Sequence, residues 1–417
     1  MKFSCDDGIL KVTLPERINT GNVTEFEKEL FALKELNDAK EIVFDANNLK
    51  FISSLGLRVI FKFEKKFEDT PLTIINTSSE VREILDETGI TSFVKVYKKM
   101  RQVDLNSLTL LGEGMYGSVY RINEEQILKI FHQVQSEIEM WKIIKGIRIA
   151  FTHDIPTIMP FEVVKTDKGF GMVLELLNST ELSTLMHDNP KDFDKYVVEM
   201  VELAKSLANA RIEEGKLKNF NDYITEFVDR SSEFLTPEEI TAIKHYIDIV
   251  PRRNSCVHCD FHAKNIMIME GKPLLIDMDY FCCGHPVWDI GCTHRIYQMF
   301  PHFSDDITHK LFELQGITLA DLYFKMIGFT VDEADRCWQK FFDEYFKDYS
   351  EQEKIYLAET AKVYGTFAVL WFALERCHLV KDDPARLQLK IDAARFFLKE
   401  MQAVDTAHLI KAFEVWK

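Results

Sequence analysis

The sequence predicts an α/β domain followed by a larger α+β domain with a β-rich first lobe and a helical second lobe. In residues 1–104, short apolar strand patterns alternate with helical segments of about 12 residues. Residues 105–177 read as an antiparallel meander around a glycine-rich turn, and residues 178–417 follow a mostly helical pattern. We therefore expect three parts with these boundaries: a sheet with covering helices, a β-rich lobe and a helical lobe.

Apolar runs and capping residues place the individual elements. In the first part, strands are expected at residues 9–14, 41–45, 72–75 and 94–97. Helices are expected from the cap candidates at 19–22 through about 36, from near Ser54, and after Ser78 and Ser79. In the second part, strands are expected at residues 107–111, 118–121 and 127–131. Because strand and helix alternate only in the first part, the two parts have different folds.

The charge balance argues against a nucleic-acid ligand. The 417 residues are 46% hydrophobic and carry a net charge of −16, whereas a phosphate backbone is bound by clustered Lys and Arg. Residues 1–104 hold 16 basic and 18 acidic residues, and the remainder 35 basic and 49 acidic. The acidic remainder suits a cationic or neutral substrate, although an acidic surface also keeps proteins soluble.

The sequence shows no signal-peptide pattern and no membrane span. Its N-terminal residues lack an apolar run, and its longest apolar stretch, about 367–374, is far shorter than the ~20 residues that cross a bilayer. We expect a cytoplasmic protein.

Eight cysteines in a chain of this length do not form a disulfide scaffold. Cys256 and Cys259, together with Cys282 and Cys283, have spacings that suit a zinc site. The same segment fits the catalytic pattern described below far better, so we do not expect zinc.

A glycine-rich turn joins the first two strands of the β-rich lobe. Its sequence, Gly112-Glu113-Gly114-Met115-Tyr116-Gly117-Ser118-Val119, matches G-x-G-x-x-G-x-V. It lies between two strands, as the loop over ATP phosphates does in protein kinases, and not between strand and helix. A backbone without Cβ atoms can approach phosphate oxygens closely. We therefore expect Gly112, Gly114, Gly117 and Val119 to bind the nucleotide.

Lys129 lies within the apolar strand Ile127–Phe131. Burying an ammonium there is costly unless it meets an anion, and ATP phosphates with a helix glutamate would provide one. Glu139 is the favoured glutamate, with Glu137 nearly as good. The alternative is a solvent-facing lysine on an alternating strand.

The most specific pattern is His258-Cys259-Asp260-Phe261-His262-Ala263-Lys264-Asn265, which reads H-x-D-x-H-x-x-N and precedes Ile276-Asp277-Met278-Asp279. Asp260 fits the carboxylate that orients an attacking hydroxyl and accepts its proton. Asn265 and Asp277 supply the hard oxygen ligands that Mg²⁺ prefers against ATP phosphates. His258 and His262 are expected to support this loop and not to act as bases.

These motifs resemble the aminoglycoside phosphotransferase and choline kinase branch of the kinase-like superfamily over about residues 105–415. That branch reads H-G-D-x-H-x-x-N, then I-D, then G-x-P-x-x-D-L, and Gly284-His285-Pro286-Val287-Trp288-Asp289-Ile290 matches the last element. The resemblance implies that Asp289 braces the catalytic loop and that adenine packs at 171–177, near Glu175 and Leu176. Cys259 replaces the usual glycine, which would be strained if this position has a positive φ.

Residues 1–104 resemble STAS domains, the fold of anti-sigma-factor antagonists, through Leu49–Ile60 at a strand-to-helix junction. In that family the residue equivalent to Ser54 is often phosphorylated, and Ser53 precedes it here. A phosphate there would be favoured by the helix dipole. Alternatively, Ser53 and Ser54 only cap the helix and the domain docks a protein partner.

Together, the patterns predict an ATP- and Mg²⁺-dependent phosphotransferase acting on a hydroxyl of a small molecule, such as an amino sugar or a choline-like cation. The STAS-like domain would regulate or dock it. One alternative is a signalling kinase that phosphorylates Ser54 in its own or another chain, because fusion raises the local concentration of that serine. A second alternative is a nucleotide-binding pseudokinase scaffold, which only Cys259 favours.

Overall fold

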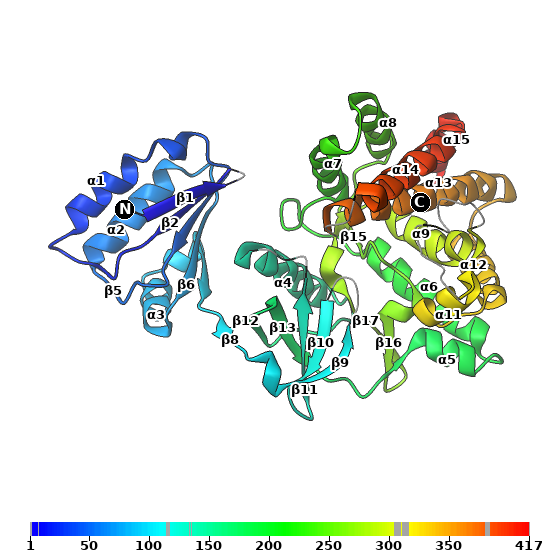
Figure 1. Ribbon diagram of the computed structural model, residues 1–417, viewed down its shortest axis with the longest axis horizontal. Helices are drawn as coiled ribbons and strands as arrows, with labels where there is room; N and C mark the ends of the chain where they lie inside the picture. Colours follow the sequence, from blue (N-terminus) through cyan, green and yellow to red (C-terminus); the bar gives the residue numbers. More distant parts are fainter. Residues whose placement is uncertain are drawn as a thin grey trace. The chain divides into compact units, whose positions relative to one another are not determined.

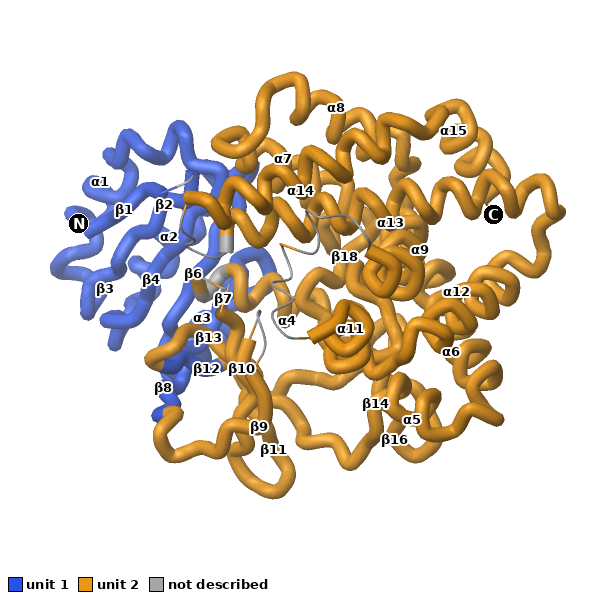
Figure 2. The backbone as a smooth tube through the Cα atoms, turned by 45° about the vertical axis from the view of Figure 1, so that its right-hand side comes forward, with its two compact units in different colours: residues 1–104, 164–166 blue, residues 105–163, 167–417 orange. Residues whose placement is uncertain are grey.

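The computed structural model describes residues 2–6, 8–113, 117–132, 134, 136–303, 310, 317–379 and 384–416. The chain forms two compact units, drawn in blue and orange in Figure 2. The first unit comprises residues 1–104 with 164–166, and the second comprises residues 105–163 with 167–417.

The first unit is a five-stranded sheet with helices packed on it (Figure 1). Its strand order is β1-β2-β4-β6-β7, in which β1 and β2 are antiparallel and the other neighbours are parallel. The strands are β1 (Lys2–Asp6), β2 (Ile9–Thr13), β4 (Glu41–Asp45), β6 (Leu72–Thr77) and β7 (Lys95–Lys98), with a separate parallel pair of β3 (Arg17–Ile18) and β5 (Phe51–Ile52). The helices are α1 (Val23–Phe31), α2 (Ser54–Lys66) and α3 (Ser79–Glu87). Three successive residues of β4, Ile42 to Phe44, are fully buried, as is typical of a central parallel strand.

The two-residue strands of this unit are not expected from the sequence, and two longer elements also differ from the expectation. Strand β1 is not expected because all five of its residues are exposed and Phe3 and Cys5 are its only apolar residues, too short a pattern to predict a strand. Its ladder with β2 holds it in place. The helix expected to reach about residue 36 ends at Phe31, and a separate 3-10 turn follows at Lys34–Asn37. Both errors concern exposed or boundary residues, where apolar periodicity is weakest.

The second unit begins with a sheet in the order β12-β13-β11-β10-β9. Its strands are β9 (Thr109–Glu113), β10 (Gly117–Arg121), β11 (Gln126–Phe131), β12 (Glu162–Thr166) and β13 (Gly169–Glu175), and its helix is α4 (Glu137–Thr152). β12 also pairs in parallel with β8 (Arg101–Gln102), through Val164 and Lys165. Residues 164–166 of β12 are therefore counted with the first unit, although the strand continues the second unit's sheet. Antiparallel register places Gly112, Val119, Lys129 and Met172 in one row across β9, β10, β11 and β13. Residues in such a row share one face of the sheet.

The rest of the second unit is mainly helical and carries residues 258–279 on short hairpins. The helices are α5 (Leu182–Asp188), α6 (Phe193–Asn209), α7 (Phe220–Arg230), α8 (Pro237–Asp248), α9 (Val287–His294), α11 (Leu319–Ile327), α12 (Val331–Tyr345), α13 (Glu351–Leu379), α14 (Pro384–Gln402) and α15 (Thr406–Val415). The short strands are β14 (Thr180–Glu181), β15 (Ser255–Val257), β16 (Ile266–Met269), β17 (Lys272–Leu275) and β18 (Cys282–Gly284). β15 pairs with β18, and β14, β16 and β17 form a second small sheet.

Two glycines allow α9 and α13 to pack at very short range. A Cβ on Gly291 of α9 would lie 2.7 Å from backbone atoms of Tyr364 in α13. A Cβ on Gly365 of α13 would lie 2.5 Å from Nδ1 of His294 in α9. Side chains rarely approach this closely, so both positions need glycine for the helices to pack as they do. The contact fixes the turn after α9 against the middle of α13.

Candidate active site

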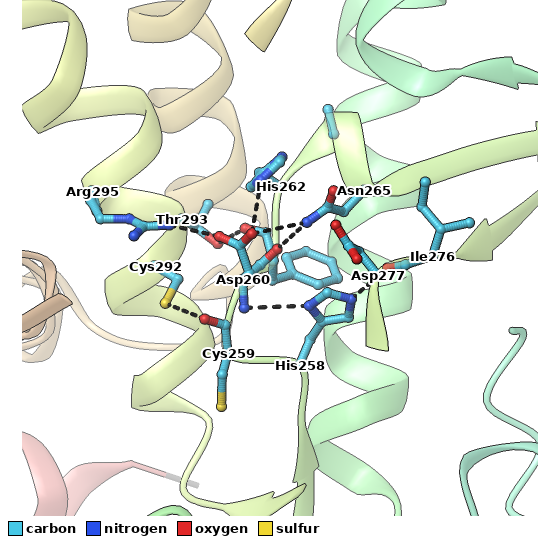
Figure 3. A network of polar contacts seen from close by, with 12 residues as sticks. His258, Cys259, Asp260, His262, Asn265, Ile276, Asp277, Cys292, Thr293 and Arg295 are labelled. Carbon is cyan, nitrogen blue, oxygen red and sulfur yellow. Dashed lines mark hydrogen bonds and ion pairs between the residues drawn. The ribbon is translucent and has the colours of Figure 1, made fainter. Parts of the chain in front are cut away.

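The candidate catalytic loop joins β15 to β16 and carries Asp260 at its centre (Figure 3). Asp260 Oδ1 accepts a hydrogen bond from Arg295 Nη2 at 2.6 Å. Asp260 Oδ2 accepts one from Asn265 Nδ2 at 3.2 Å and lies 3.5 Å from His262 Nε2. Figure 3 shows Arg295 approaching Asp260 from the side opposite Asn265 and Asp277. Three side chains therefore fix the carboxylate in one orientation.

The environment of Asp260 keeps its carboxylate ionised. Burial raises the pKa, but interactions with His262 and Arg295 outweigh burial and leave the pKa below the usual range for aspartate. The side chain remains 34% exposed, so a substrate hydroxyl can reach it. An ionised, positioned carboxylate is the group that can take a hydroxyl proton during phosphoryl transfer.

Asp289 and His258 hold the backbone of the loop. Asp289, at the start of α9 and 5% exposed, accepts hydrogen bonds from the backbone N–H of His258 at 2.9 and 3.0 Å and of Cys259 at 2.7 Å. Burial raises the pKa of Asp289 to about 7, and these hydrogen bonds oppose the rise. His258 Nε2 donates to Ile276 O at 2.9 Å, and its Nδ1 accepts from the Asp260 N–H at 3.3 Å. Both side chains thus make the contacts that bracing the loop requires.

Cys259 has a left-handed backbone with φ of +65°, the conformation that favours glycine. The replacement of the usual glycine is therefore strained, at a cost of about 1–3 kcal/mol. Its N–H is held by Asp289, and its carbonyl accepts a 3.0 Å hydrogen bond from Cys292 Sγ. These contacts maintain the strained turn, so the arrangement around Asp260 is retained.

Lys129 of β11 contacts the carboxylates of Asp277 and Asp279. Its Nζ donates to Asp277 Oδ1, and to the two Asp279 oxygens at 2.9 and 3.0 Å. Burial lowers the Lys129 pKa, but these two carboxylates outweigh burial and raise it above its usual value. Burial raises the pKa of Asp279 to about 6, Lys129 lowers it and Asp277 raises it. Asp279 was assigned no role from sequence; its position two residues after Asp277 is the signal that identifies it.

The glutamate expected to pair with Lys129 stays a prediction. Glu139 forms a capping box with Ser136 at the start of α4, and its carboxylate accepts from the Ser136 N–H at 3.2 Å. The side chain of Glu137 lies outside the described residues. The hydrogen bonds described for Lys129 go to the two aspartates, and its Nζ also lies 4.7 Å from the Phe131 ring centroid.

The residues expected to bind the nucleotide lie in two places: one row across the sheet that contains β9 to β13, and the end of β13. Gly112 and Val119 lie in the same row as Lys129, whereas Gly114 lies outside the described residues. A Cβ on Gly117 would lie 2.3 Å from Ile130 O, so this strand crossing requires glycine.

At the far end of the sheet, Glu175 is exposed and ends β13. The Leu176 N–H donates to Glu125 O at 2.8 Å, so this N–H is already used within the lobe. The Leu176 N–H therefore does not serve the predicted adenine contact in this arrangement.

A cluster of aromatic rings and one carboxylate includes Tyr280, which closely follows the Asp277 motif in the sequence. Tyr280, three residues after Asp277, packs against Trp371 of α13 with ring centroids 5.2 Å apart, and Tyr223 of α7 lies 6.3 Å from Tyr280 and 6.4 Å from Trp371. The rings meet edge to face, and Tyr280 Oη donates to Glu375 Oε1 at 2.5 Å. Glu375 is 7% exposed. The sequence reading missed these residues because they come from three distant segments.

In the first unit, Ser53 and Ser54 are distinguished by their positions. Ser53 is the N-cap of α2, and its Oγ accepts from the Gly56 N–H at 3.3 Å. Ser54 is the first helical residue and is exposed. The capping function thus belongs to Ser53.

The β-rich lobe, the helical lobe and the loop around Asp260 define a kinase-like phosphotransferase. A family scan matches residues 107–317 to the "Phosphotransferase enzyme family" and residues 2–103 to the "STAS domain". The chain belongs to this phosphotransferase family and carries an N-terminal STAS domain, which confirms both resemblances and the fold class.

Individual relatives were found for both parts of the chain. The protein named as the anti-sigma factor antagonist BtrV of Bordetella bronchiseptica is 31% identical over 100 residues, which is 23% of this chain and 85% of that protein. The ADP-bound aminoglycoside phosphotransferase APH(2'')-Ib is 16% identical, with 78% of this chain and 99% of that chain covered and a TM-score of 0.44. A choline/ethanolamine kinase family protein of Mesorhizobium loti is 13% identical, with 74% and 92% covered and a TM-score of 0.43.

Two features are absent from the part of the chain that the structure describes. No helix in them is long and apolar enough to cross a membrane. Among the same residues, no three His, Cys, Asp or Glu side chains are arranged to hold a metal ion.

Proposed function

We propose that the chain transfers the γ-phosphate of ATP, with Mg²⁺, to a hydroxyl of a small molecule that carries a cationic group. The observation that carries this proposal is the convergence of Asp260, Asn265, Asp277 and Lys129. Asp260 provides an ionised carboxylate, Asn265 an amide, Asp277 a second carboxylate and Lys129 an ammonium. These are the groups that phosphoryl transfer from ATP requires.

The residues present suit Mg²⁺. The Asn265 amide nitrogen faces Asp260, at 2.9 Å from its carbonyl and 3.2 Å from its carboxylate, and this leaves the amide oxygen as a donor for a hard cation. The Asp277 carboxylate provides a second oxygen donor, once Lys129 turns to the phosphates. Mg²⁺ there would neutralise charge that develops on the β- and γ-phosphates. Asp260 orients the acceptor hydroxyl and takes its proton, and Arg295 keeps that carboxylate in place.

The aromatic cluster supports a cationic acceptor. Ammonium groups bind over the faces of Trp and Tyr and beside carboxylates, and Tyr223, Tyr280, Trp371 and Glu375 provide both. Burial raises the pKa of Tyr223, and the charge of Glu375 raises it further, so a negative potential reaches that ring. Lys218 Nζ already lies 5.9 Å from the centroid of the Tyr223 ring.

The test uses the full chain, γ-labelled ATP, Mg²⁺ and a metabolite extract separated by ion exchange into cationic, neutral and anionic fractions. We expect label to enter compounds of the cationic fraction and to be lost in Asp260→Ala. Asp260-dependent label confined to the neutral or anionic fraction would retain the enzyme and overturn the cationic acceptor. Absence of Asp260-dependent label from all three fractions would overturn the small-molecule kinase and favour the scaffold.

A second function is favoured by Ser54. Because Ser53 already caps α2, the exposed Ser54 is available for modification at a helix N-terminus, where a phosphate is stabilised. This function is phosphorylation of Ser54 by the kinase domain of the same or another chain. The test is the intact mass of the protein after incubation with ATP, compared with Ser54→Ala, Ser53→Ala and Asp260→Ala. Addition of one phosphate that requires Ser54 and Asp260 but not Ser53 is expected. Unchanged mass, or a phosphate that persists in Ser54→Ala, would exclude it.

A further inference from the structure

Five of the eight cysteines surround the catalytic loop. Cys256 lies in β15, Cys259 in the loop, Cys282 and Cys283 in β18, and Cys292 in α9, and all five are buried. Two of them meet: Cys259 Sγ lies 3.8 Å from Cys282 Sγ. Cys259 stands where the resembled family has glycine, at a positive φ. Its thiol is therefore present at a backbone position that disfavours any side chain.

We propose that Cys259 and Cys282 form a reversible disulfide in response to a peroxide, and that this bond inactivates the catalytic loop. The pairing rests on geometry alone, and the inactivation rests on the phosphotransfer proposed above. The β15–β18 ladder pairs Val257 with Cys282, and Cys259 follows this pair by two residues, in the loop after β15.

The chemistry needs one peroxide and two thiols. Cys282 is the more exposed of the pair, at 8% against 2% for Cys259, so its sulfur meets the oxidant first. Its sulfur attacks one peroxide oxygen, the S–O bond forms and the O–O bond breaks, and the thiol proton joins the departing hydroxide to give one water. The Cys259 sulfur then attacks the Cys282 sulfur, the S–S bond forms, the S–O bond breaks and the second water leaves. The two thiols lose two electrons, and hydrogen peroxide is reduced to two waters.

The bond would displace the loop that carries Asp260. A disulfide holds its sulfurs about 2.05 Å apart, so this pair must close by nearly 2 Å from the observed contact. The Cys259 N–H donates a hydrogen bond to Asp289, and its carbonyl accepts one from Cys292. Asp260 is the next residue, so a shift of Cys259 is passed to it. A displacement of about 1 Å at a catalytic group lowers turnover roughly 100-fold.

The test treats the reduced full chain with hydrogen peroxide and maps its peptides by mass spectrometry. We expect a 259–282 cross-linked peptide in the wild type and in Cys283→Ser, and none in Cys282→Ser. Cys283 is the matched control because it is buried in the same strand and faces Cys256 in the ladder. Asp260-dependent phosphotransfer, taken relative to each untreated variant, should fall about 100-fold with the cross-link and return on addition of dithiothreitol.

The two parts of the proposal fail in different ways. Oxidation of other thiols without a 259–282 peptide would overturn the pairing, and this readout does not depend on enzyme activity. A 259–282 peptide with unchanged phosphotransfer would overturn the inactivation. Equal loss of activity in Cys282→Ser and in the wild type would also overturn it. Thermal unfolding of each variant before treatment shows that it is folded.

Discussion

Replacing Asp289 with asparagine tests how the catalytic loop is held. The carboxylate accepts hydrogen bonds from the N–H groups of His258 and Cys259, at distances between 2.7 and 3.0 Å. An asparagine keeps the shape but offers one acceptor oxygen and places an N–H₂ group against the second donor. At least one charge-assisted hydrogen bond of about 1.5–3 kcal/mol is lost, and a buried donor is left unsatisfied. Because Asp260 directly follows these residues, we expect kcat to fall roughly 100-fold.

The assay is Asp260-dependent transfer of label from ATP, measured as kcat and KM between pH 5.5 and 8.5. Burial raises the pKa of Asp289 to about 7. In the wild type, the Asp289 carboxylate is therefore charged above that pH and becomes protonated as the pH falls through 7. The kcat of the wild type should fall over the same range. Asp289→Asn has no group to titrate there, and its low kcat should lack this step.

Asp45→Asn is the matched control. Asp45 also accepts two N–H hydrogen bonds, from Asn47 N and Asn76 Nδ2 at 3.0 Å each, but it lies in the STAS unit. Its kcat should equal that of the wild type. A kcat of Asp289→Asn within a few-fold of the wild type, or a step near pH 7 that persists in this variant, would refute the bracing of the loop by Asp289.

Three further substitutions test separate parts of the molecule. Arg295→Gln removes the guanidinium that holds Asp260 Oδ1, so kcat should fall roughly 10-fold with little change in KM; an unchanged kcat contradicts this positioning. Glu375→Gln should raise KM for a cationic acceptor about 10-fold with little change in kcat, and an unchanged KM removes Glu375 from acceptor binding. Ser53→Ala should lower the stability of the STAS unit by about 1 kcal/mol in thermal unfolding, whereas Ser54→Ala should leave it unchanged; equal losses would show that both serines cap α2.

The sequence was most informative where chemistry fixes residue spacing. Asp260 and Asn265 lie five residues apart, and the structure brings their side chains together within one short loop. The strands around the glycine-rich turn could be predicted because they alternate apolar and polar residues between turn signals. Roles for these residues in binding and catalysis stay predictions for the experiments above.

Contacts that depend on tertiary packing could not be predicted. Arg295 follows Asp260 by 35 residues and reaches it only because the helical lobe folds α9 against the loop. The aromatic cluster joins three segments with no common motif. The α4 glutamate expected to pair with Lys129 stays a prediction, whereas the contacts of Lys129 with Asp277 and Asp279 are not expected from the sequence, because they join β11 to a motif almost 150 residues away.

The close packing of α9 on α13 has a consequence for changing substrate preference. Through Gly291 and Gly365, one helix supports both the turn that carries Arg295 and the segment that carries Trp371 and Glu375. Directed evolution of the acceptor site can therefore vary the outer turns of α13 freely only while both glycines stay. A single added methyl group at either glycine would shift Trp371 and Glu375, the proposed acceptor residues, together with Asp260, so specificity and rate of the proposed enzyme would change together.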